Sequence, residues 1–562
     1  GPDGEGIFAG DGVLLGHRRL AILDLDVRAA QPMQSGCGRY VIVFNGEIYN
    51  FRDLRREFEA TGEVLLTTSD TEVLLRLFAR DGEAMLPKLH GMFAFVIWDK
   101  VAQRAFAARD AYGIKPLYIA HFAGGVGFAS QVKALVATGL VSGEPDPKGR
   151  AGFWMLGSVP EPHTCFRDIQ SLPPGHYVWV ENGTLRSMRC WQDIGAAWRE
   201  PADAAPADVQ ALVRMALRES VARHLVADVP VGVFLSGGID SGALAGLMVA
   251  EGARDLVGVT IAYDEFAGRH EDEAPVAARL AAHYGIRHHI RRVTRDEFQA
   301  DLPRILQAMD QPTIDGVNTW YASKAVAELG LKVVVSGVGG DELFQGYSSF
   351  RQLPRIVAGW RAASRLPGAR ILAGAAAGLR ARQTGNQRWR HAPDWARTIA
   401  GAWWLRRSVH APEELPALMG AELAHEALRN FDPVEWVQAM TGLLASEPVL
   451  ALGQIESMCY LRNQLLRDSD WASMDHSVEL RTPLVDSKLL LTVRCALPTF
   501  SGFPNKNLLA NAPTMPLPHD IVHRAKTGFG IPVNRWLTEA GGYIPGQMGW
   551  MRRVSEQQGV VA

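Results

Sequence analysis

A glycine-rich loop, "LSGGIDSG" (residues 235–242), follows a run of apolar residues and precedes a helical pattern. Gly237 and Gly238 allow the backbone to approach a ligand closely and to adopt positive φ. The N–H groups of such a loop, with the start of the next helix, form a cradle for an anion. Ser236 and Ser241 add hydroxyl donors, which an ordinary glycine turn would not require. The spacing of the Walker loop is absent, so the stretch predicts a phosphate-binding loop of another type.

Two acidic residues follow loops of this kind. Asp240 cannot favour a bare phosphate by its charge, so we predict that it holds Mg²⁺ bound to the phosphate. A second glycine-rich loop, in "KVVVSGVGGDELFQGY", also follows an apolar strand and supplies Asp341. Two carboxylates with phosphate oxygens are an ordinary Mg²⁺ arrangement. We therefore predict Asp240 and Asp341 as a pair of metal ligands, with Gly337 of the second loop facing the same phosphates.

A third group with suitable chemistry is Lys526, in the turn-rich segment "RAKTGFGIP". A lysine between turn residues can reach a pyrophosphate or a developing negative charge. We predict that Lys526 binds phosphate and takes part in catalysis. The alternative interpretation is a solvated surface charge, which is the more common role of a single lysine.

A parallel sheet would bring these loops together. Short strands ("VPVGVFL", "DLVGVTIAY", "RHHIRRV" and "KVVVS") alternate with helical patterns between residues 209 and 336. Nearly continuous apolar strands such as the first are typical of sheets buried on both faces. The alternation predicts a doubly wound parallel α/β domain, in which ligands bind at the carboxyl ends of the strands.

The first 130 residues follow a different pattern. Short β-rich segments bounded by Gly or Asp are interrupted by two amphipathic helices, near residues 51–62 and 69–82, which predicts β-sheets with helices packed outside. The stretch "DIGAAWREPADAAPAD" has no apolar period and predicts a linker. We expect a first domain over residues 1–193, a linker over 194–208, and a second domain over 209–545 with a helical insertion at about 351–450.

Composition excludes several classes of protein. The 562 residues are 47% hydrophobic and 21% charged, and a net charge of −2 argues against a whole-chain nucleic-acid binder. No run of about eighteen apolar residues occurs, so we predict no transmembrane helix. Five scattered cysteines without CxxC spacing favour a reducing, cytoplasmic location and predict neither a disulfide framework nor a metal centre.

One stretch has an unusual charge pattern. Between Arg351 and Arg407 the chain carries twelve arginines and one acid, Asp394. A run of like charge is usually a solvated helical face, and we prefer that interpretation. Contact with a partner or with RNA is the alternative.

The ordered motifs together resemble those of the asparagine synthetase family. They are "GPDGEG", "GHRRLAILDL", "FNGEIYN", "SDTEVLL", "GMFAFVIWD", "RDAYGIKPLY", "LPPGHY", "LSGGIDS", "SGVGGDELFQGY", "LLRDSDWASMDHSVELRTPLVD" and "KTGFGIP". The resemblance covers nearly the whole chain and is weakest at roughly 355–450. It implies an N-terminal Ntn-type αββα glutaminase domain and a C-terminal ATP-pyrophosphatase domain that uses ATP and Mg²⁺. ATP would adenylylate a carboxylate and release pyrophosphate, and ammonia from glutamine, arriving through an internal tunnel, would displace AMP.

The resemblance also assigns roles in the first domain. Arg19 would hold the glutamine carboxylate, and Glu47 and Asp70 would bind its α-ammonium group. Asn45 and Gly46 would form the oxyanion hole, since a side-chain amide N–H and a backbone N–H can converge on one oxygen. Without a ligand, Arg19 and Glu47 could be surface charges, and Asp70 could be a helix N-cap.

The opening "GPDGEGIFAG" resembles the loop that follows the first strand and helix of such a glutaminase domain. The nucleophile implied by the resemblance is an N-terminal Cys whose own α-amine acts as base, and we expect its segment to precede Gly1. Cys37 cannot replace it, because Cys37 is internal and has no free α-amine. We therefore expect the chain as written to lack glutaminase activity but to use free ammonia.

One departure from the family pattern bears on the acceptor. Members that make asparagine usually carry Glu where this chain has Val338, and valine can neither take a proton nor hold a charge. The first hypothesis is glutamine-dependent amidation of aspartate, and the second is the same reaction on another carboxylate, such as a sugar acid, a peptide or a secondary metabolite. A tRNA-modifying or RNA-binding ATP-pyrophosphatase is the third, which the glutaminase-like first 130 residues disfavour.

These hypotheses imply small-molecule partners: glutamine, ATP, and aspartate or another carboxylate. We expect no membrane and no nucleic-acid partner, and we consider a homodimer as the candidate assembly.

Overall fold

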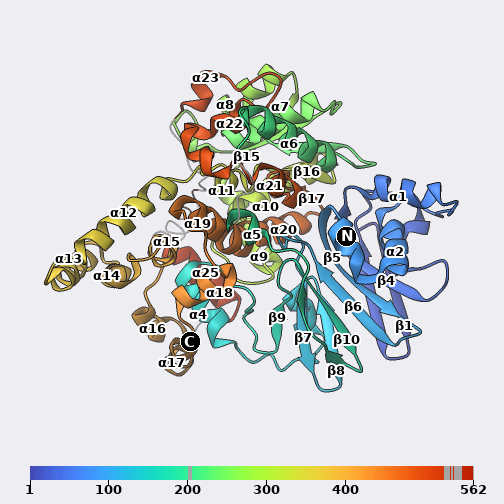
Figure 1. Ribbon diagram of the computed structural model, residues 1–562, viewed down its shortest axis with the longest axis horizontal. Helices are drawn as coiled ribbons and strands as arrows, with labels where there is room; N and C mark the ends of the chain where they lie inside the picture. The colour runs from blue at the N-terminus through green and yellow to red at the C-terminus, as the bar shows by residue number, and fades with distance from the viewer. Residues whose placement is uncertain (200–204, 525–531, 533–535, 537–546, 561–562) are drawn as a thin grey trace.

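The computed structural model describes residues 1–199, 205–524, 532, 536 and 547–560 (Figure 1). An N-terminal unit rich in β-strands lies beside a unit built on a parallel sheet, and a group of helices projects from the second unit. Among the described residues, no helix has both the length and the apolar character that crossing a bilayer requires.

The N-terminal unit contains three antiparallel sheets. A hairpin, β1 with β2, pairs Gly4 with Arg19 and Gly10 with Val13. The largest sheet has the order β11-β10-β6-β5-β4-β3, with β12 also paired to β10, and the third has the order β8-β7-β9. The bounds are β1 Gly4–Gly10, β2 Val13–Arg19, β3 Met33–Gln34, β4 Tyr40–Ile48, β5 Gly91–Asp99, β6 Arg104–Arg109, β7 Tyr118–Phe122, β8 Gly125–Ala129, β9 Ile169–Ser171, β10 His176–Glu181, β11 Thr184–Leu185 and β12 Arg189–Cys190.

Four layers result from how these sheets pack. Alternation along β4 sends Ile42 to one face of the large sheet and Val41 to the other. On the first face, α1 (Phe51–Ala60) and α2 (Asp70–Asp81) complete a core. The second face packs on the three-stranded sheet, whose outer side is covered by α3 (Val132–Ala137). This α-β-β-α arrangement confirms the fold expected for the first unit.

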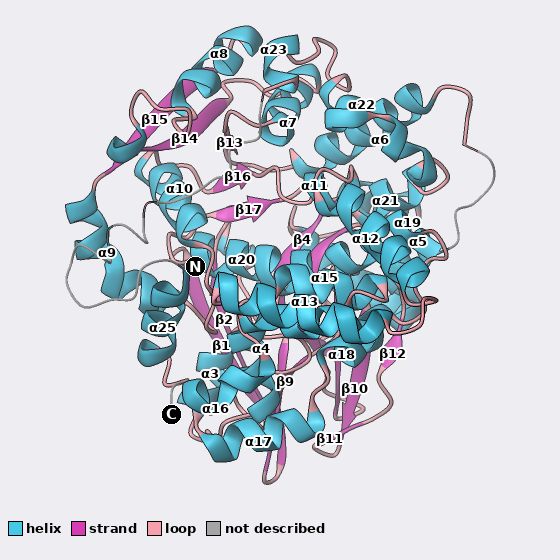
Figure 2. Ribbon diagram, turned by 90° about the vertical axis from the view of Figure 1, so that its left-hand side faces the viewer, coloured by secondary structure: helices cyan, strands magenta, loops and turns pink. Residues whose placement is uncertain are grey.

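The second unit is built on a five-stranded parallel sheet with the order β15-β14-β13-β16-β17. Figure 2 shows β13, β16 and β17 between the outer strands β14 and β15 and the long strands of the first unit. The chain order reverses between β13 and β16, and such a switch point leaves a crevice at the carboxyl ends of the strands. Both glycine-rich loops begin there, so the predicted doubly wound domain is confirmed. The bounds are β13 Val231–Phe234, β14 Val257–Tyr263, β15 Arg287–Val293, β16 Val333–Val335 and β17 Glu479–Arg481.

Helices surround this sheet and fill the long connection between β16 and β17. The helices around the sheet are α6 Val209–His224, α7 Ile239–Ala250, α8 Ala274–Tyr284, α9 Arg295–Ala308, α10 Val317–Glu328, α21 Ser487–Val493, α22 Asn507–Ala510, α23 His519–Val522 and α25 Gln547–Gln557. Those of the connection are α11 Gly340–Leu343, α12 Ser349–Ala363, α13 Ala369–Thr384, α14 Ala392–Trp395, α15 Ile399–Arg407, α16 Leu415–Met419, α17 Ala421–Asn430, α18 Pro433–Thr441, α19 Pro448–Ile455, a π-helix over Glu456–Leu466, and α20 Arg467–Met474.

The arginine-rich stretch forms α12 to α15, and α12 to α14 project from the molecule (Figure 1). Ten of its twelve arginines are exposed, as expected for a solvated face. Arg388 and Arg407 are the exceptions. The guanidinium of Arg407 lies 2.7 Å from the buried carboxylate of Glu456.

Two elements differ from what the sequence patterns indicated. The stretch expected as a linker begins with a helix, α5 (Ile194–Arg199), because Trp198 is buried against the second unit despite the lack of an apolar period. β17 was not predicted, because it has three residues and two of them are charged. The strand is held by pairing with β16, a contact with residues more than a hundred positions earlier. One more helix, α4 (Pro147–Leu156), lies between α3 and β9 in the chain.

Candidate active sites

Hydroxyl groups hold the first glycine-rich loop in shape between β13 and α7. The backbone N–H of Ser236 donates to Ser241 Oγ at 3.0 Å, and the two hydroxyls lie 2.9 Å apart. The N–H of Gly238 donates to Ser236 Oγ at 3.1 Å. α7 begins directly after Gly238, so its positive end adjoins the loop. The predicted phosphate residues thus share one loop, and their contact with phosphate stays a prediction.

The second loop approaches the first so closely that it requires glycine. A Cβ added to Gly337 would lie 2.9 Å from Asp240 Cβ, and one added to Gly340 would lie 2.5 Å from Asp240 Oδ1. Gly339 has a φ of 94°, which larger residues rarely adopt. The backbone of the second loop therefore packs directly against the side chain of Asp240 in the first loop.

Lys506 joins the two acidic residues that the sequence predicted as metal ligands. Its Nζ lies 2.6 Å from both carboxylate oxygens of Asp240 and 2.7 Å from Asp341 Oδ1. Burial opposes the charged form of Lys506, but the two carboxylates outweigh burial and raise its pKa. The structure thus brings Asp240 and Asp341 together, with an ammonium group between them. In the described part of the chain, no cluster of three or more His, Cys, Asp or Glu side chains is suited to a metal ion.

Sequence reasoning missed Lys506. Asn505 and Lys506 both have positive φ, 55° and 52°, which is uncommon for residues other than glycine. Strained backbone of this kind is concentrated at functional sites. The surrounding letters "GFPNKNLL" contain no loop pattern like those at the two strand ends, so the sequence offers only a lysine before a short apolar helix.

Arg524 is a second residue that sequence reasoning missed near the first loop. A Cβ on Gly237 would lie 2.8 Å from Arg524 Nη1, and Arg524 Nη2 donates to the carbonyl of His270 at 2.7 Å. Lys526, two positions later, was predicted to bind phosphate and lies outside the described residues.

A buried acid lies behind the second loop. The hydroxyl of Tyr347 donates to Glu342 Oε1 at 2.7 Å. Burial, followed by the nearby charge of Asp341, raises the pKa of Glu342 to about 7. Val338, at the position where the family pattern has glutamate, packs against the apolar core. Glu342 is therefore a group beside this loop that can change protonation near neutral pH.

A second, smaller site is a cavity of 80 Å³ in the first unit. Its walls include the four residues predicted to bind glutamine, Arg19, Asn45, Glu47 and Asp70, and Gly46, which was predicted to complete the oxyanion hole with Asn45. Met474 and Glu479 of the second unit also line it. The structure therefore places the predicted residues around one cavity, and residues of the second unit complete the wall of that cavity.

β4 positions three of these residues by strand geometry. Asn45 and Glu47 are two positions apart, so they share one face of the strand. Between them, Gly46 has a φ of 141°, and a Cβ there would lie 2.0 Å from the carbonyl oxygen of Met92 on the neighbouring strand β5. Only glycine fits at this position.

The two acids that the sequence predicted for this cavity, Glu47 and Asp70, are buried, with 5% of each residue exposed, so the interpretation of Glu47 as a surface charge is wrong. Burial and then the nearby charge of Glu479 raise the pKa of Glu47, and burial raises the pKa of Asp70 to about 6. Asp70 Oδ2 accepts the N–H of Ile48 at 2.9 Å. The N-cap of α2 is Ser69, not Asp70, because the Ser69 side chain accepts the helix N–H at 3.3 Å.

Arg19, at the end of β2, is half-buried and tied to the loop that follows it, so it too is not a free surface charge. Its guanidinium donates to the carbonyls of Leu23 and Asp26, each at 3.0 Å, and to that of Asp24. A guanidinium has five N–H donors, so further donors remain for a ligand carboxylate.

Known proteins show the same two-part organisation. A model of the glutamine amidotransferase domain matches residues 1–191, and a model of asparagine synthase matches residues 212–544. A putative glutamine-hydrolysing asparagine synthetase of Mycobacterium tuberculosis is 33% identical, over 96% of this chain and 83% of its own length. The chain belongs to the asparagine synthetase family.

Two further relatives match different shares of the chain. Asparagine synthetase 1 of Bacillus subtilis is 30% identical over 96% of this chain and 83% of its own length. A protein named amidase chyE, of Penicillium rubens, is 32% identical over 62% of this chain and 54% of its own length. As a family member, the chain is an ATP-dependent ligase of the glutamine amidotransferase type.

In this member of the asparagine synthetase family, buried ion pairs join the two units. Arg481 of β17 lies 3.4 Å from Glu47 Oε1 and 2.7 Å from Glu479 Oε1. Lys115, in the motif "RDAYGIKPLY", donates from Nζ to Asp470 Oδ1 at 3.3 Å. The wall of the 80 Å³ cavity is therefore held in place by the second unit.

Proposed function

We propose that this chain is a glutamine-dependent asparagine synthetase. The side-chain carboxylate of aspartate attacks the α-phosphorus of ATP, pyrophosphate leaves, and an acyl-adenylate forms. Ammonia from glutamine then attacks the acyl carbon, and AMP leaves. Activation is needed because a free carboxylate is a poor electrophile.

The observation that carries the proposal is the meeting of both glycine-rich loops at Lys506, Asp240 and Asp341. Loop N–H groups and the end of α7 offer donors to a polyphosphate. An ammonium group beside them stabilises the charge that develops on departing pyrophosphate. The two carboxylates have the donor type that Mg²⁺ prefers, and Mg²⁺ would supply further neutralisation of the phosphates there.

The cavity of the first unit supports the glutamine half of the reaction. Glu47 and Asp70 offer negative charge to the α-ammonium group of glutamine, and Arg19 offers N–H donors to its carboxylate. The Asn45 side chain and the Gly46 N–H are suited to a developing oxyanion. Because Met474 and Glu479 of the ligase unit line the same cavity, ammonia released here could pass between the units without entering bulk water.

A second candidate is the same reaction on another carboxylate. Val338 favours it, since an apolar side chain packed on the core cannot exchange a proton with ammonia or an acceptor. In that case Glu342, whose pKa is raised to about 7, is the group of this loop suited to hold that proton.

The test is release of AMP and pyrophosphate with ammonia supplied directly, so that glutaminase activity is not needed. Aspartate should produce AMP at a rate well above the ammonia-only background. A panel of sugar acids, amino acids and peptides tests the second candidate. A rate of AMP release with aspartate that is no higher than background contradicts asparagine synthesis. If AMP release rises above background only with a different carboxylate, the result supports the second candidate.

A further inference from the structure

A larger cavity, of 590 Å³, lies between the two units. Its size is within the usual range for small-molecule sites, roughly 300–1,000 Å³. It shares no wall residue with the glutamine-site cavity and none with the two glycine-rich loops. Its walls come from the end of the first unit, from α5, from α18 and from the π-helix, and include His176, Cys190, Ile194, Met440, Met458 and Arg462.

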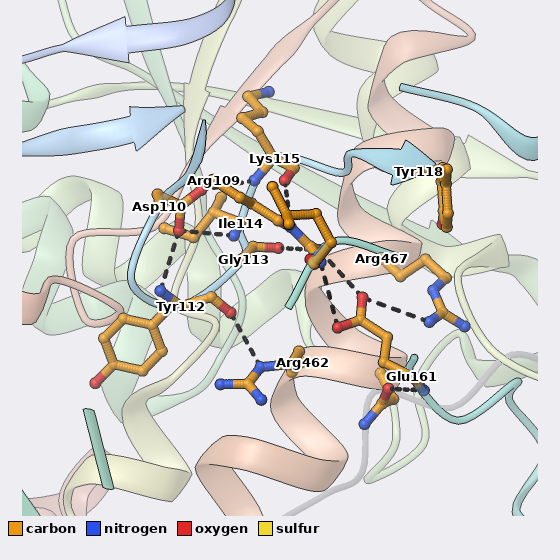
Figure 3. A network of polar contacts seen from close by, with 12 residues as sticks. Arg109, Asp110, Tyr112, Gly113, Ile114, Lys115, Tyr118, Glu161, Arg462 and Arg467 are labelled. Carbon is orange, nitrogen blue, oxygen red and sulfur yellow. Dashed lines mark hydrogen bonds and ion pairs between the residues drawn. The ribbon is translucent and has the colours of Figure 1, made fainter. Parts of the chain in front are cut away.

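Arg462 is the unusual member of this wall. Its residue is 4% exposed, and its Nε donates to the carbonyl of Tyr112 at 3.2 Å. Within the described chain its two terminal nitrogens make no hydrogen bond and no ion pair. Figure 3 shows them turned away from the carboxylate of Glu161. A buried charge without a partner is costly, and burial accordingly lowers the pKa of this guanidinium.

The neighbouring carboxylates are already engaged. Glu161 accepts from Arg109 Nη1 at 3.3 Å and from Nη2 at 3.1 Å, and it lies 3.8 Å from Arg467 Nη2. Two guanidinium groups, those of Arg109 and Arg467, therefore lie against this carboxylate (Figure 3). Burial alone would raise the pKa of Glu161, but the arginines outweigh it and hold that pKa below its usual value. Glu161 is thus ionised and committed to Arg109.

Two other acids of the network are also occupied. Asp110 accepts the backbone N–H groups of the turn after β6, including that of Ile114 at 3.0 Å (Figure 3). Asp470 pairs with Lys115. Asp193 and Arg199 of the cavity wall pair with each other at 2.6 Å. The positive charge of Arg462 is therefore left for a group from outside the described chain.

The remaining wall indicates what the rest of such a ligand is like. Ile194, Met440 and Met458 are apolar, and prolines at 162, 173 and 174 add further carbon surface. A single guanidinium fork matches one carboxylate in two parallel hydrogen bonds, and a phosphate with two charges would lack a second cation here. Arg462 also belongs to the π-helix, a rare form of helix that is frequently found at functional sites.

We propose that this cavity is a second small-molecule site, which binds a monocarboxylate with an apolar body and holds its carboxylate at Arg462. The site is independent of the substrate assigned to the ligase reaction, so it can fail or hold without affecting that assignment.

Two exposed thiols provide the test. Cys190 lines the cavity, and Cys37 lies elsewhere in the first unit. Both are alkylated with iodoacetamide, a neutral reagent, and each rate is followed by peptide mass analysis with hexanoate or with hexanamide, its uncharged counterpart. Hexanoate should slow alkylation of Cys190 and leave the rate at Cys37 unchanged, and hexanamide should have a much weaker effect.

Variants assign the effect to Arg462. Arg462→Gln should raise the hexanoate concentration needed for half-protection by about tenfold or more, because a hydrogen bond between charged groups is lost. Arg462→Lys should restore part of the protection, and Arg361→Gln, at an exposed arginine of α12, should behave as wild type. Melting curves establish that each variant is folded.

Three results would overturn the proposal. The first is a Cys190 rate that hexanoate does not change in the wild-type protein. The second is equal protection by hexanoate and hexanamide, which needs no variant and so holds even if Arg462→Gln does not fold. The third is unchanged hexanoate protection in folded Arg462→Gln.

Discussion

At the scale of single residues, Lys506 joins the two loops of the proposed ATP site. Its ammonium group contacts both Asp240 and Asp341, and its charge offsets the repulsion between these two half-buried carboxylates. The sequence motifs indicated the carboxylates, because each follows a glycine-rich loop at a strand end. The lysine lies 165 positions after Asp341, outside any such loop.

Replacing Lys506 tests its role. Lys506→Met should reduce AMP formation by about a hundredfold or more, since removal of one group that stabilises transition-state charge has that size of effect. Lys488→Met, at an exposed lysine of α21, is the matched control and should keep the wild-type rate. A folded Lys506→Met protein with an unchanged rate would show that the lysine only balances charge.

Asp70 predicts a pH dependence of stability. Because burial raises its pKa to about 6, the folded protein binds this proton more tightly than the unfolded chain does. The stabilisation from the proton is fully present below about pH 4, the unfolded value, and is lost as pH rises through about 6. Asp70→Asn, which keeps a neutral side chain, should raise the free energy of unfolding by up to about 3 kcal/mol at pH 8.

Urea unfolding at pH 8 and at pH 4 measures this difference, which should nearly vanish at the lower pH. Asp53→Asn, on the exposed face of α1, is the control and should change stability little at either pH. Equal effects of Asp70→Asn at both pH values would mean that the ionisation of Asp70 does not limit stability.

At the scale of elements, the strands set the geometry of both sites. β4 presents Asn45 and Glu47 on one face and needs glycine between them. β13 and β16 are neighbours in the parallel sheet, so the loops after them meet at the switch point. The alternation and the apolar runs of these strands could be recognised in the sequence. β17 could not be predicted, because a strand of three residues flanked by loops is too short to show a periodic pattern.

Gly46→Ala tests how tightly β4 is held. The new methyl group would lie 2.0 Å from the Met92 carbonyl oxygen at a φ of 141°, so β4 must move away from β5. We expect a loss of at least about 2 kcal/mol of stability, measured by thermal or urea unfolding of the first unit. Gly16→Ala in β2, where a Cβ meets no atom within 4 Å, should cost much less. Equal effects of the two would contradict the steric argument.

At the scale of the whole molecule, the cavity that we propose for glutamine has wall residues from both units. Arg481 of the ligase unit contacts Glu47 of the first unit, and its Nη1 donates to the His224 carbonyl at 2.9 Å. Lys115 and Asp470 make a second buried contact across the same boundary. The 590 Å³ cavity with Arg462 lies along this boundary as well.

Removing Arg481 should therefore destabilise both units together. Arg481→Met leaves Glu47 and Glu479 buried without their shared cation, which we expect to cost about 3–5 kcal/mol. Adding Glu479→Gln should recover part of that loss, because one uncompensated charge is removed. Arg56→Met, at a surface pair on α1, should cost less than about 1 kcal/mol. The unfolding of each unit is followed by fluorescence specific to that unit. A loss of stability in only one of the two units would contradict the coupling.

The sequence by itself determined the local chemistry of this protein. The two glycine-rich loops and the strand alternation of "YVIVFNGEI" are local patterns, so period and spacing were enough to predict two α/β units and a phosphate-binding edge in the second. The ordered motifs added a family resemblance, and that resemblance implied the ligase reaction and the residues of the glutamine site. What the tertiary structure decided are contacts between distant segments: Lys506 between the two aspartates, Arg481 beside Glu47, and the unpaired Arg462 in a cavity between units. Such contacts arise when burial brings charges together across hundreds of residues, and no local period records them.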